Sequence, residues 1–482
     1  MIKRTSFSKG CVLSIAMALH DPKKEKEGYS VNKADAHYQK MTQTPVAKLI
    51  LRLGIPTTLS MLITSIYNMA DTYFVGSLGE SAQAATGVLF TLQAIIQGIA
   101  FMLGHGSGSF VSKELANKDT KKASEYISSA FYSGGLIGIV ILILGLVFLT
   151  PLVRFLGSTE TILPHARDYG FWVLMSCPFM ICSLVLNNGL RYEGKAFYAM
   201  FGLITGGLLN IFSDYLLVYK LRMGVHGAGL ATAASQFVSF CILLVMYEKM
   251  AQSSIRMKYI SRNWLLYLSI AHVGMPSLIR QGLNAVSSGL LNNLTKPFGD
   301  AAIAAMSIVS RYAMFLLCLG LGIGQGFQPV AAFNYQAKKY ERVKKGLLFT
   351  MGFGFLCIGA PSLISIFSAE FIIRLFQSDS EVIRVGAVAL QFYALGMMFA
   401  PLSIPVNMLY QSIQKPTVSS VLSLLRSGAV TIPMLLIGVP ALGLTGVQIA
   451  QPAADVVAGL VSIPFIVHFL RQKSEDIEKL PT

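Results

Sequence analysis

The chain has 482 residues, of which 54% are apolar and only 13% are charged, and its mean hydropathy is +0.59. A water-soluble chain of this length carries far more charge, so the composition excludes a soluble globular protein and indicates an integral membrane protein. The formal net charge of +16 would suit a nucleic-acid partner, but the basic residues stand in loops between apolar segments, where they report membrane topology instead.

Residues 1–41 precede the first long apolar segment. A basic start is followed by a short apolar run at residues 11–19 and then by a lysine-rich polar stretch. The run is short for a secretory signal and no clear cleavage site follows it, so we expect a disordered cytoplasmic tail. A cleaved signal is the alternative.

Apolar segments then follow one another along the whole chain. A helix needs about 20 residues to cross the hydrocarbon core of a bilayer. Twelve segments meet this length, near residues 50–75, 82–110, 124–150, 163–188, 196–219, 227–248, 264–294, 301–334, 345–368, 383–411, 416–438 and 443–470. Lysine and arginine concentrate in the loops after spans 2, 4, 6, 8 and 10, so the positive-inside rule places both termini in the cytoplasm.

The two halves of the chain repeat each other at a shift of 220 residues, without a gap. The matched pairs include Gly54 with Gly274, Pro56 with Pro276, Gly79 with Gly299, Gly106 with Gly326, Lys118 with Lys338, Asn187 with Asn407 and Lys195 with Lys415. Because each unit has an even number of spans, both have the same orientation in the membrane, and a pseudo-two-fold axis along the membrane normal should relate them.

The repeat predicts an all-α membrane protein of twelve transmembrane helices in two six-helix lobes. We expect an N-terminal cytoplasmic tail (1–41), an N-lobe with spans 1–6 (42–250), a cytoplasmic loop between the lobes (251–263), a C-lobe with spans 7–12 (264–470) and a C-terminal cytoplasmic tail (471–482).

Polar side chains inside spans are functional candidates by default, because each costs free energy in lipid unless it is paired or faces water. Asp71 lies near the end of span 1 and Asp214 near the end of span 5, at one depth. Tyr67 and Asn210 each lie four residues earlier on the same helix face, and Thr232 of span 6 falls at the same level. These five side chains are predicted to converge in the outer half of the N-lobe.

Two carboxylates in an apolar pocket cannot both ionise cheaply, so one takes a proton or a cation lies between them. The alternative is that one aspartate only caps a helix or bonds a neighbouring amide. Pro56 precedes Asp71 by 15 residues and removes a backbone hydrogen bond from span 1, which predicts a hinge.

The second lobe has different chemistry. Leu291 and Met434 stand where Asp71 and Asp214 would be repeated. Its charged residues within spans are Arg280, Arg311, Arg426 and Asp455. We expect Asp455 to neutralise one arginine, and the remaining arginines to bond carbonyl groups or line a substrate cleft.

The sequence offers no catalytic site. It has no nucleophile with a base, and its cysteines and histidines show no metal-ligand spacing, so no cofactor is expected and no metal beyond a possible Na⁺ at the acidic site. His105 and the other span-end histidines are interpreted as interfacial residues. The glycine-rich stretch at 104–108 ends a hydrophobic span, and it is interpreted as a close helix contact rather than a phosphate loop.

Several segments together resemble the multidrug and toxic compound extrusion (MATE) family, in its DinF-like, MepA-like prokaryotic branch. The resemblance covers about residues 42–472, and the segments that carry it are 54–76, 112–119, 210–214, 227–232 and 326–335. Residues 1–40 exceed the usual family length, so Met41 is an alternative start.

The resemblance implies that Asp71, Asn210, Asp214 and Thr232 form a proton or sodium site, with Tyr67 beside it. It also implies that span 1 bends at Pro56. The implied function is an H⁺- or Na⁺-coupled multidrug efflux antiporter in the prokaryotic inner (plasma) membrane. Such a protein exports amphiphilic, often cationic, compounds by alternating access, as a monomer and without a nucleic-acid partner. Some relatives place a cation site on acids of spans 7 and 10, which are absent here.

Three other functions compete with the antiporter. A flippase for lipid-linked phosphates or polysaccharide intermediates, from the same wider superfamily, would use the C-lobe arginines. A membrane-embedded enzyme lacks the catalytic groups described above. A channel is disfavoured, because a coupling site inside one lobe serves a carrier better than a pore.

Overall fold

The computed structural model describes residues 34–472, and these residues are helical apart from short connections. Residues 34–43 are helical. The first half of the chain then forms α3 (Val46–Gly76), α4 (Glu80–Ala116), α5 (Thr120–Val147), α6 (Leu149–Phe155), α7 (Leu163–Tyr192), α8 (Ala196–Asp214), the π-helical η1 (Tyr215–Lys220), α9 (Gly224–Met250) and the short η2 (Met257–Tyr259).

The second half repeats this order. It forms α10 (Trp264–Thr295), η3 (Lys296–Phe298), α11 (Asp300–Gln336), α12 (Tyr340–Gly354), the π-helical η4 (Phe355–Gly359), α13 (Ala360–Arg374), α14 (Ser380–Met397), α15 (Ala400–Ser412), α16 (Pro416–Leu424), the π-helical η5 (Leu425–Ala429), α17 (Thr431–Leu442) and α18 (Leu444–Arg471). Several helices begin where a side chain caps them: Asp119 Oδ1 accepts from the amide of Lys122 at 2.9 Å, and Asp379 caps α14 similarly.

The all-helical membrane architecture is confirmed. Within residues 34–472, ten helices are long and apolar enough to cross a membrane, and the bent pair α14 and α15 makes an eleventh. The remaining predicted span, α10, has 32 residues but does not meet the same test of apolarity. His272, Arg280, Gln281 and Asn284 lie along it. Apolarity therefore supports ten or eleven of the twelve predicted spans.

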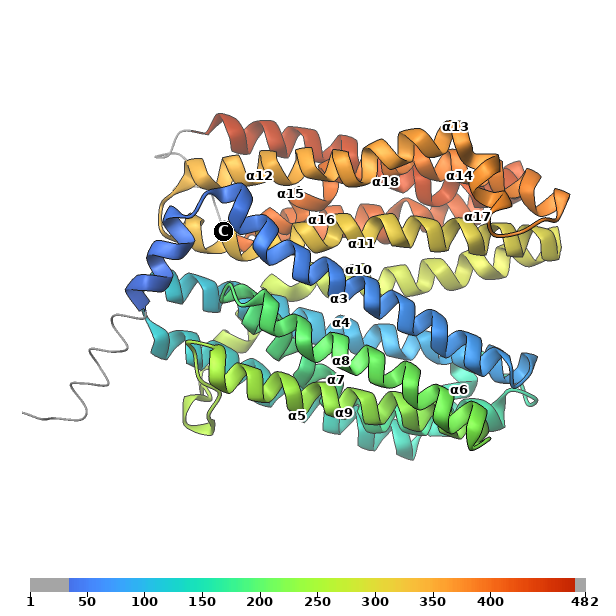
Figure 1. Ribbon diagram of the computed structural model, residues 1–482, viewed down its shortest axis with the longest axis horizontal. Coiled ribbons are helices and arrows are strands. Elements are labelled where there is room, and N and C mark those ends of the chain that lie inside the picture. Colours follow the sequence, from blue (N-terminus) through green and yellow to red (C-terminus); the bar gives the residue numbers. More distant parts are fainter. Residues whose placement is uncertain (1–33, 473–482) are drawn as a thin grey trace, which may run out of the picture.

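The helices form two bundles that lie side by side along the long axis of the molecule (Figure 1). The N-terminal bundle contains α3–α9 and the C-terminal bundle α10–α18. They meet where α4 packs against α10 and α3 packs against α11. Both termini of the described chain lie at one end, at the left of Figure 1.

The 220-residue repeat is visible in the backbone itself. Three turns have left-handed φ angles at matched positions of both halves: Gly79 and Gly299 (φ 118° and 85°), Lys118 and Lys338 (62° and 56°), and Gly194 and Gln414 (72° and 61°). Only a residue that tolerates this conformation can end a helix in this way. The halves therefore share turn geometry even where the residue type has changed.

The repeat also determines how the bundles touch. A methyl group added at Gly106 of α4 would lie 2.1 Å from the carbonyl oxygen of Ile270 on α10, and one at Gly326 of α11 would lie 2.9 Å from that of Ile50 on α3. Each residue of the first contact is 220 positions from its counterpart in the second. A pseudo-two-fold axis thus relates the two interfaces, and the glycines at 104–108 serve close helix packing, as expected.

The prediction of a disordered tail is wrong for residues 34–41. This segment packs across the end of the molecule that holds the termini: Asp35 pairs with Lys118 at 2.6 Å, and His37 makes an edge-on contact with the ring of Phe333. Met41 is fully buried, and its carbonyl oxygen accepts from Asn334 at 3.2 Å. The predicted alternatives for residues 11–19 lie outside the described residues.

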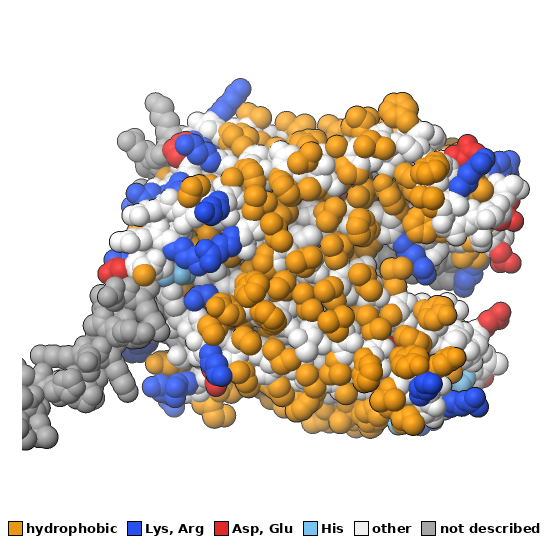
Figure 2. Space-filling view, viewed as in Figure 1, with side chains coloured by type: hydrophobic (Ala, Val, Ile, Leu, Met, Phe, Trp, Pro, Cys, Tyr) orange, Lys and Arg blue, Asp and Glu red, His pale blue; other side chains and the backbone are white. Residues whose placement is uncertain are grey.

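The surface fits a bilayer. Hydrophobic side chains cover the middle of the molecule, and charged side chains gather toward its two ends (Figure 2). Large apolar residues such as Leu136 and Phe367 are 63% and 85% exposed on helix surfaces. In water such exposure would be costly, whereas lipid removes the cost.

Candidate functional site

The two N-lobe aspartates lie in the interior of one bundle. Asp71 is on α3 and Asp214 ends α8, and they lie close enough for their charges to interact. Tyr169 on α7 donates its hydroxyl hydrogen to Oδ2 of Asp71 at 3.0 Å and is itself 3% exposed. Sequence reasoning missed Tyr169, because a lone tyrosine in an apolar span carries no motif.

The other predicted members complete the cluster. Nδ2 of Asn210 lies 3.4 Å from Oγ1 of Thr232, which joins α8 to α9. Tyr67 packs its ring against Gly207, where a methyl group would come within 3.1 Å of that ring. The structure thus brings the five predicted side chains together and adds Tyr169.

Acceptor oxygens dominate this site. Both carboxylate oxygens of Asp214, Oδ1 of Asp71 and Oδ1 of Asn210 are buried and have no hydrogen-bond partner within the described residues. Buried acceptors without a donor are costly, and a proton or a small cation would satisfy them. The arrangement is therefore suited to binding H⁺ or Na⁺.

The backbone next to Asp214 is irregular. The α-helix α8 ends at Asp214 and continues as the π-helical segment η1. Such segments are rare and frequently mark functional sites, because they expand the helix and free backbone groups. By contrast, α3 continues unbroken through Pro56, and the hydroxyl groups of Thr57 and Ser60 bond to the carbonyl oxygens of Leu53 and Pro56.

A cleft separates the bundles at the end opposite the termini, where the molecule is hollowed (Figure 2). The Gln281 amide reaches Gln97 of α4 at 3.5 Å. Further along the same face of α10, Asn284, Ser288 and Asn292 are exposed because α4 has diverged. We call this end the open end.

Arg311 belongs to the cleft. It lies on α11 eleven residues from Gly322, on the same helical face, and Gly322 contacts Thr58 of α3. Arg311 is exposed where that face diverges from α3. It is separate from the other C-lobe charges.

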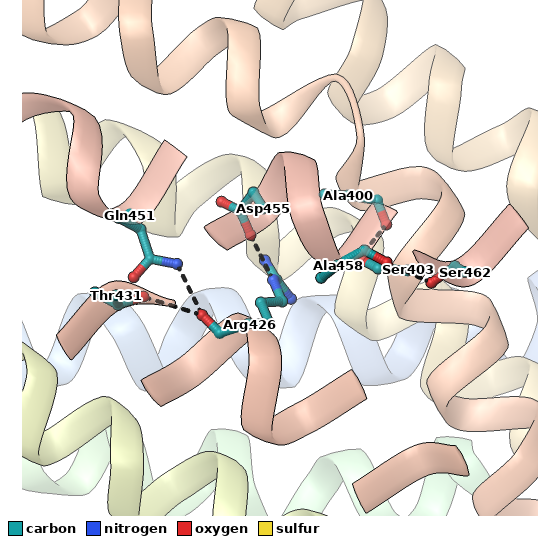
Figure 3. A network of polar contacts seen from close by, with 8 residues as sticks. All are labelled: Ala400, Ser403, Arg426, Thr431, Gln451, Asp455, Ala458 and Ser462. Atoms are coloured by element: carbon teal, nitrogen blue, oxygen red, sulfur yellow. Dashed lines mark hydrogen bonds and ion pairs between the residues drawn. The ribbon is translucent and has the colours of Figure 1, made fainter. Parts of the chain in front are cut away.

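The remaining C-lobe charges lie inside the C-terminal bundle. Arg426 donates from Nε to Asp455 Oδ1 at 2.6 Å, and the pair is largely buried (Figure 3). The carbonyl oxygen of Arg426 lies in η5 and accepts from Thr431 and Gln451 at 3.3 and 3.5 Å. Asp455 therefore neutralises Arg426, and Arg280 is left to another role.

A second buried cluster joins the bundles near the termini, and it corrects two interpretations. Arg191 was counted among loop residues, but it is 2% exposed and donates to Gln325 of α11 and to Asn188. His105 was interpreted as interfacial, but it is fully buried, stacks on Phe101 and bonds Ser277 of α10 at 2.7 Å. Tertiary packing, which the linear pattern does not show, buries both. We call this end the closed end.

Comparisons with known proteins place these features in context. The family model described as MatE matches residues 56–216 and again 276–437, one match in each bundle. The multidrug export protein MepA of Staphylococcus aureus strain MSSA476 is 25% identical over 436 residues, which cover 89% of this chain and 95% of MepA.

Solved structures agree on the fold. A multidrug resistance MATE family transporter in an outward-facing conformation superposes with a TM-score of 0.81 at 24% identity, covering 90% of this chain and 99% of the other. A transporter of the MOP superfamily from Pyrococcus furiosus, described as having a binding pocket of reversed polarity and a different function, gives a TM-score of 0.81 at 25% identity and the same coverage.

Proposed function

The chain belongs to the MATE family of secondary transporters and is not an enzyme, and from that premise we propose that it is an ion-coupled multidrug efflux antiporter. In this proposal it exports amphiphilic, cationic compounds in exchange for H⁺ or Na⁺. MepA, which shares most of its length with this chain, is a multidrug export protein.

One observation carries the proposal. Asp71 and Asp214 are buried together in one bundle with three carboxylate oxygens unpartnered. Two such groups cannot both hold a charge cheaply, so the free energy of the site depends on whether an ion is bound. Tyr67, Asn210, Thr232 and Tyr169 complete the site, and Pro56 provides the hinge of α3.

Alternating access follows from the packing of the two bundles. The closed end is sealed by glycine contacts and buried polar groups, and the open end is a cleft (Figure 2). We place the closed end and both termini in the cytoplasm of a prokaryotic cell, since the lysine-rich loops lie there. The bundles then act as the proposed lobes, residues 42–250 and 264–470, of a monomeric carrier in the plasma membrane.

The experiment is transport by purified protein in proteoliposomes. A fluorescent cationic dye is followed while a proton gradient and a sodium gradient are imposed separately at the same membrane potential. We expect one of the two gradients to drive accumulation above the level of protein-free vesicles. Accumulation that neither gradient drives would reject the antiporter.

The second candidate is a flippase for lipid-linked phosphates. Arg311 faces the cleft, and Arg280 and Arg426 lie within the C-lobe, so the two lobes present opposite charges. Transfer of a fluorescent lipid-linked phosphate between leaflets, unaffected by the Asp71→Asn change, would favour this function over the antiporter.

A further inference from the structure

A small cavity lies within the C-terminal bundle, between α10, α11, α15, α16 and η5. Its volume is about 20 Å³. Arg280 and Arg426 line it together with Asn407, Ser423 and Ser427, and the rest of its lining is apolar apart from Ser403. None of the lining residues is acidic. The cavity is therefore a positively charged site inside an apolar bundle.

The charges around this cavity do not balance. Arg426 is neutralised by Asp455, which bonds its Nε. Arg280 forms no hydrogen bond or ion pair with any residue in the described range, and the charged group that affects it most is the like charge of Arg426. An arginine that is left inside a membrane protein without a counter-charge is costly. The cavity thus has an excess of one positive charge.

The neighbouring hydrogen-bond acceptors are already used. Carbonyl oxygens near the cavity accept from side chains: that of Arg426 from Thr431 and Gln451 (Figure 3), and that of Ser427 from Ser287 at 2.7 Å. Asn407 donates to Oγ of Ser423 at 2.8 Å, which leaves the Ser423 hydroxyl hydrogen free to donate. Free donors and occupied acceptors favour an anion.

The repeat shows that this cavity is distinct from the cation site. Arg280 corresponds to Ser60 at the 220-residue shift, and Ser60 lies 11 residues before Asp71. Eleven residues of helix rise about 16 Å. The C-lobe cavity is thus closer to mid-membrane than the counterpart of the acidic cluster would be, and it duplicates nothing in the N-lobe.

We propose that this cavity binds one halide-sized anion, for which chloride is the available candidate, held by the guanidinium groups of Arg280 and Arg426 and the hydroxyl group of Ser423. The volume decides the size class, because such a cavity holds about one water-sized particle and has no room for phosphate or carboxylate. The bound anion would neutralise the excess charge of Arg280.

The test measures binding without any transport, so it stands or falls independently of the proposed function. Purified full-length protein is melted in sodium chloride and in sodium gluconate at equal sodium concentration. We expect chloride and bromide to raise the Tm saturably by a few degrees. Arg280→Gln should lose this response, and Arg374→Gln, which changes a surface arginine paired with Glu370, should keep it.

Bromide-soaked crystals of the unmodified protein give the second reading. An anomalous peak within hydrogen-bond distance of Arg280 is expected. If Arg280→Gln does not fold, Arg280→Lys keeps the charge with fewer donors and should bind bromide more weakly. A Tm independent of halide, an equal response in a folded Arg280 variant, or bromide peaks only elsewhere would each overturn the proposal.

Discussion

At the scale of single residues, the acidic cluster shows what helix periodicity can predict. The spacing of Tyr67 with Asp71 and of Asn210 with Asp214 places each pair on one helix face. The contact of Tyr169 with Asp71 joins α7 to α3 across 98 residues, so no local pattern announces it.

Replacing Asp71 or Asp214 with Asn should abolish ion-coupled transport, with a fall of at least about 100-fold toward the level of empty vesicles. An amide keeps the shape of the site but can neither take up a proton nor offer a charge to Na⁺. Gradient-driven dye uptake is the measurement, and Glu80→Gln, an exposed acid in the first turn of α4, is the matched control. Unchanged transport in both aspartate variants would contradict the coupling role.

His37 gives the packed N-terminal segment a pH dependence. Burial, with the charges of Lys195 and Lys40 second, lowers the pKa of its imidazole from 6.5 to about 3. The folded pKa is depressed, so the neutral ring contributes stability that is complete above pH 6.5 and is lost as the pH falls toward 3. At pH 5 the loss is about 2 kcal/mol.

Hydrogen exchange of residues 34–44 at pH 7.5 and pH 5 measures this loss. We expect faster exchange at pH 5 in the unmodified protein, after correction for the intrinsic rate. His37→Phe keeps a ring against Phe333 without a titrating group, so its protection should be nearly equal at both pH values. Equal acid sensitivity in the two proteins would show that another group is responsible.

At the scale of helices, close packing of α4 with α10 holds the closed end. A methyl group on Gly274 would lie 1.9 Å from the backbone oxygen of Met102, and backbone cannot move aside without separating the two helices. Gly274→Ala should therefore destabilise this state by about 1–3 kcal/mol and slow transport several-fold. The midpoint of thermal unfolding and the dye transport rate measure the two effects.

Gly282→Ala is the control on the same helix. A methyl group there meets nothing within 4 Å, so the change should leave the Tm unchanged or raise it slightly, since alanine favours the helix. If Gly282→Ala were as harmful as Gly274→Ala, the close contact with Met102 would not be the cause.

At the scale of the whole molecule, the two ends of one helix should differ in solvent access. Asn284 on α10 faces the cleft, whereas Ser277, two turns earlier, is fully buried against His105. In a cysteine-free background, Asn284→Cys should react with a membrane-impermeant maleimide added from outside, at least about tenfold faster than Ser277→Cys, because ionised thiols react only where water reaches them. Equal labelling rates would contradict a cleft that opens outward.

Sequence alone determined the elements and their order. Spans predicted from apolar runs agree with the helices to within a few residues, because a bilayer demands long apolar segments and this demand is written locally. The 220-residue repeat also needs no structure to be seen. The acidic cluster was within reach for a similar reason, since an aspartate in a span is conspicuous.

Tertiary structure alone decided what lies between the elements. It selected Arg426 rather than Arg280 or Arg311 as the partner of Asp455, buried Arg191 and His105 between the bundles, and folded residues 34–41 onto the closed end. These outcomes depend on which faces of distant helices meet. Helix periodicity gives the direction of a side chain on its own helix, whereas packing supplies its partner, and residues far apart in the sequence determine that packing.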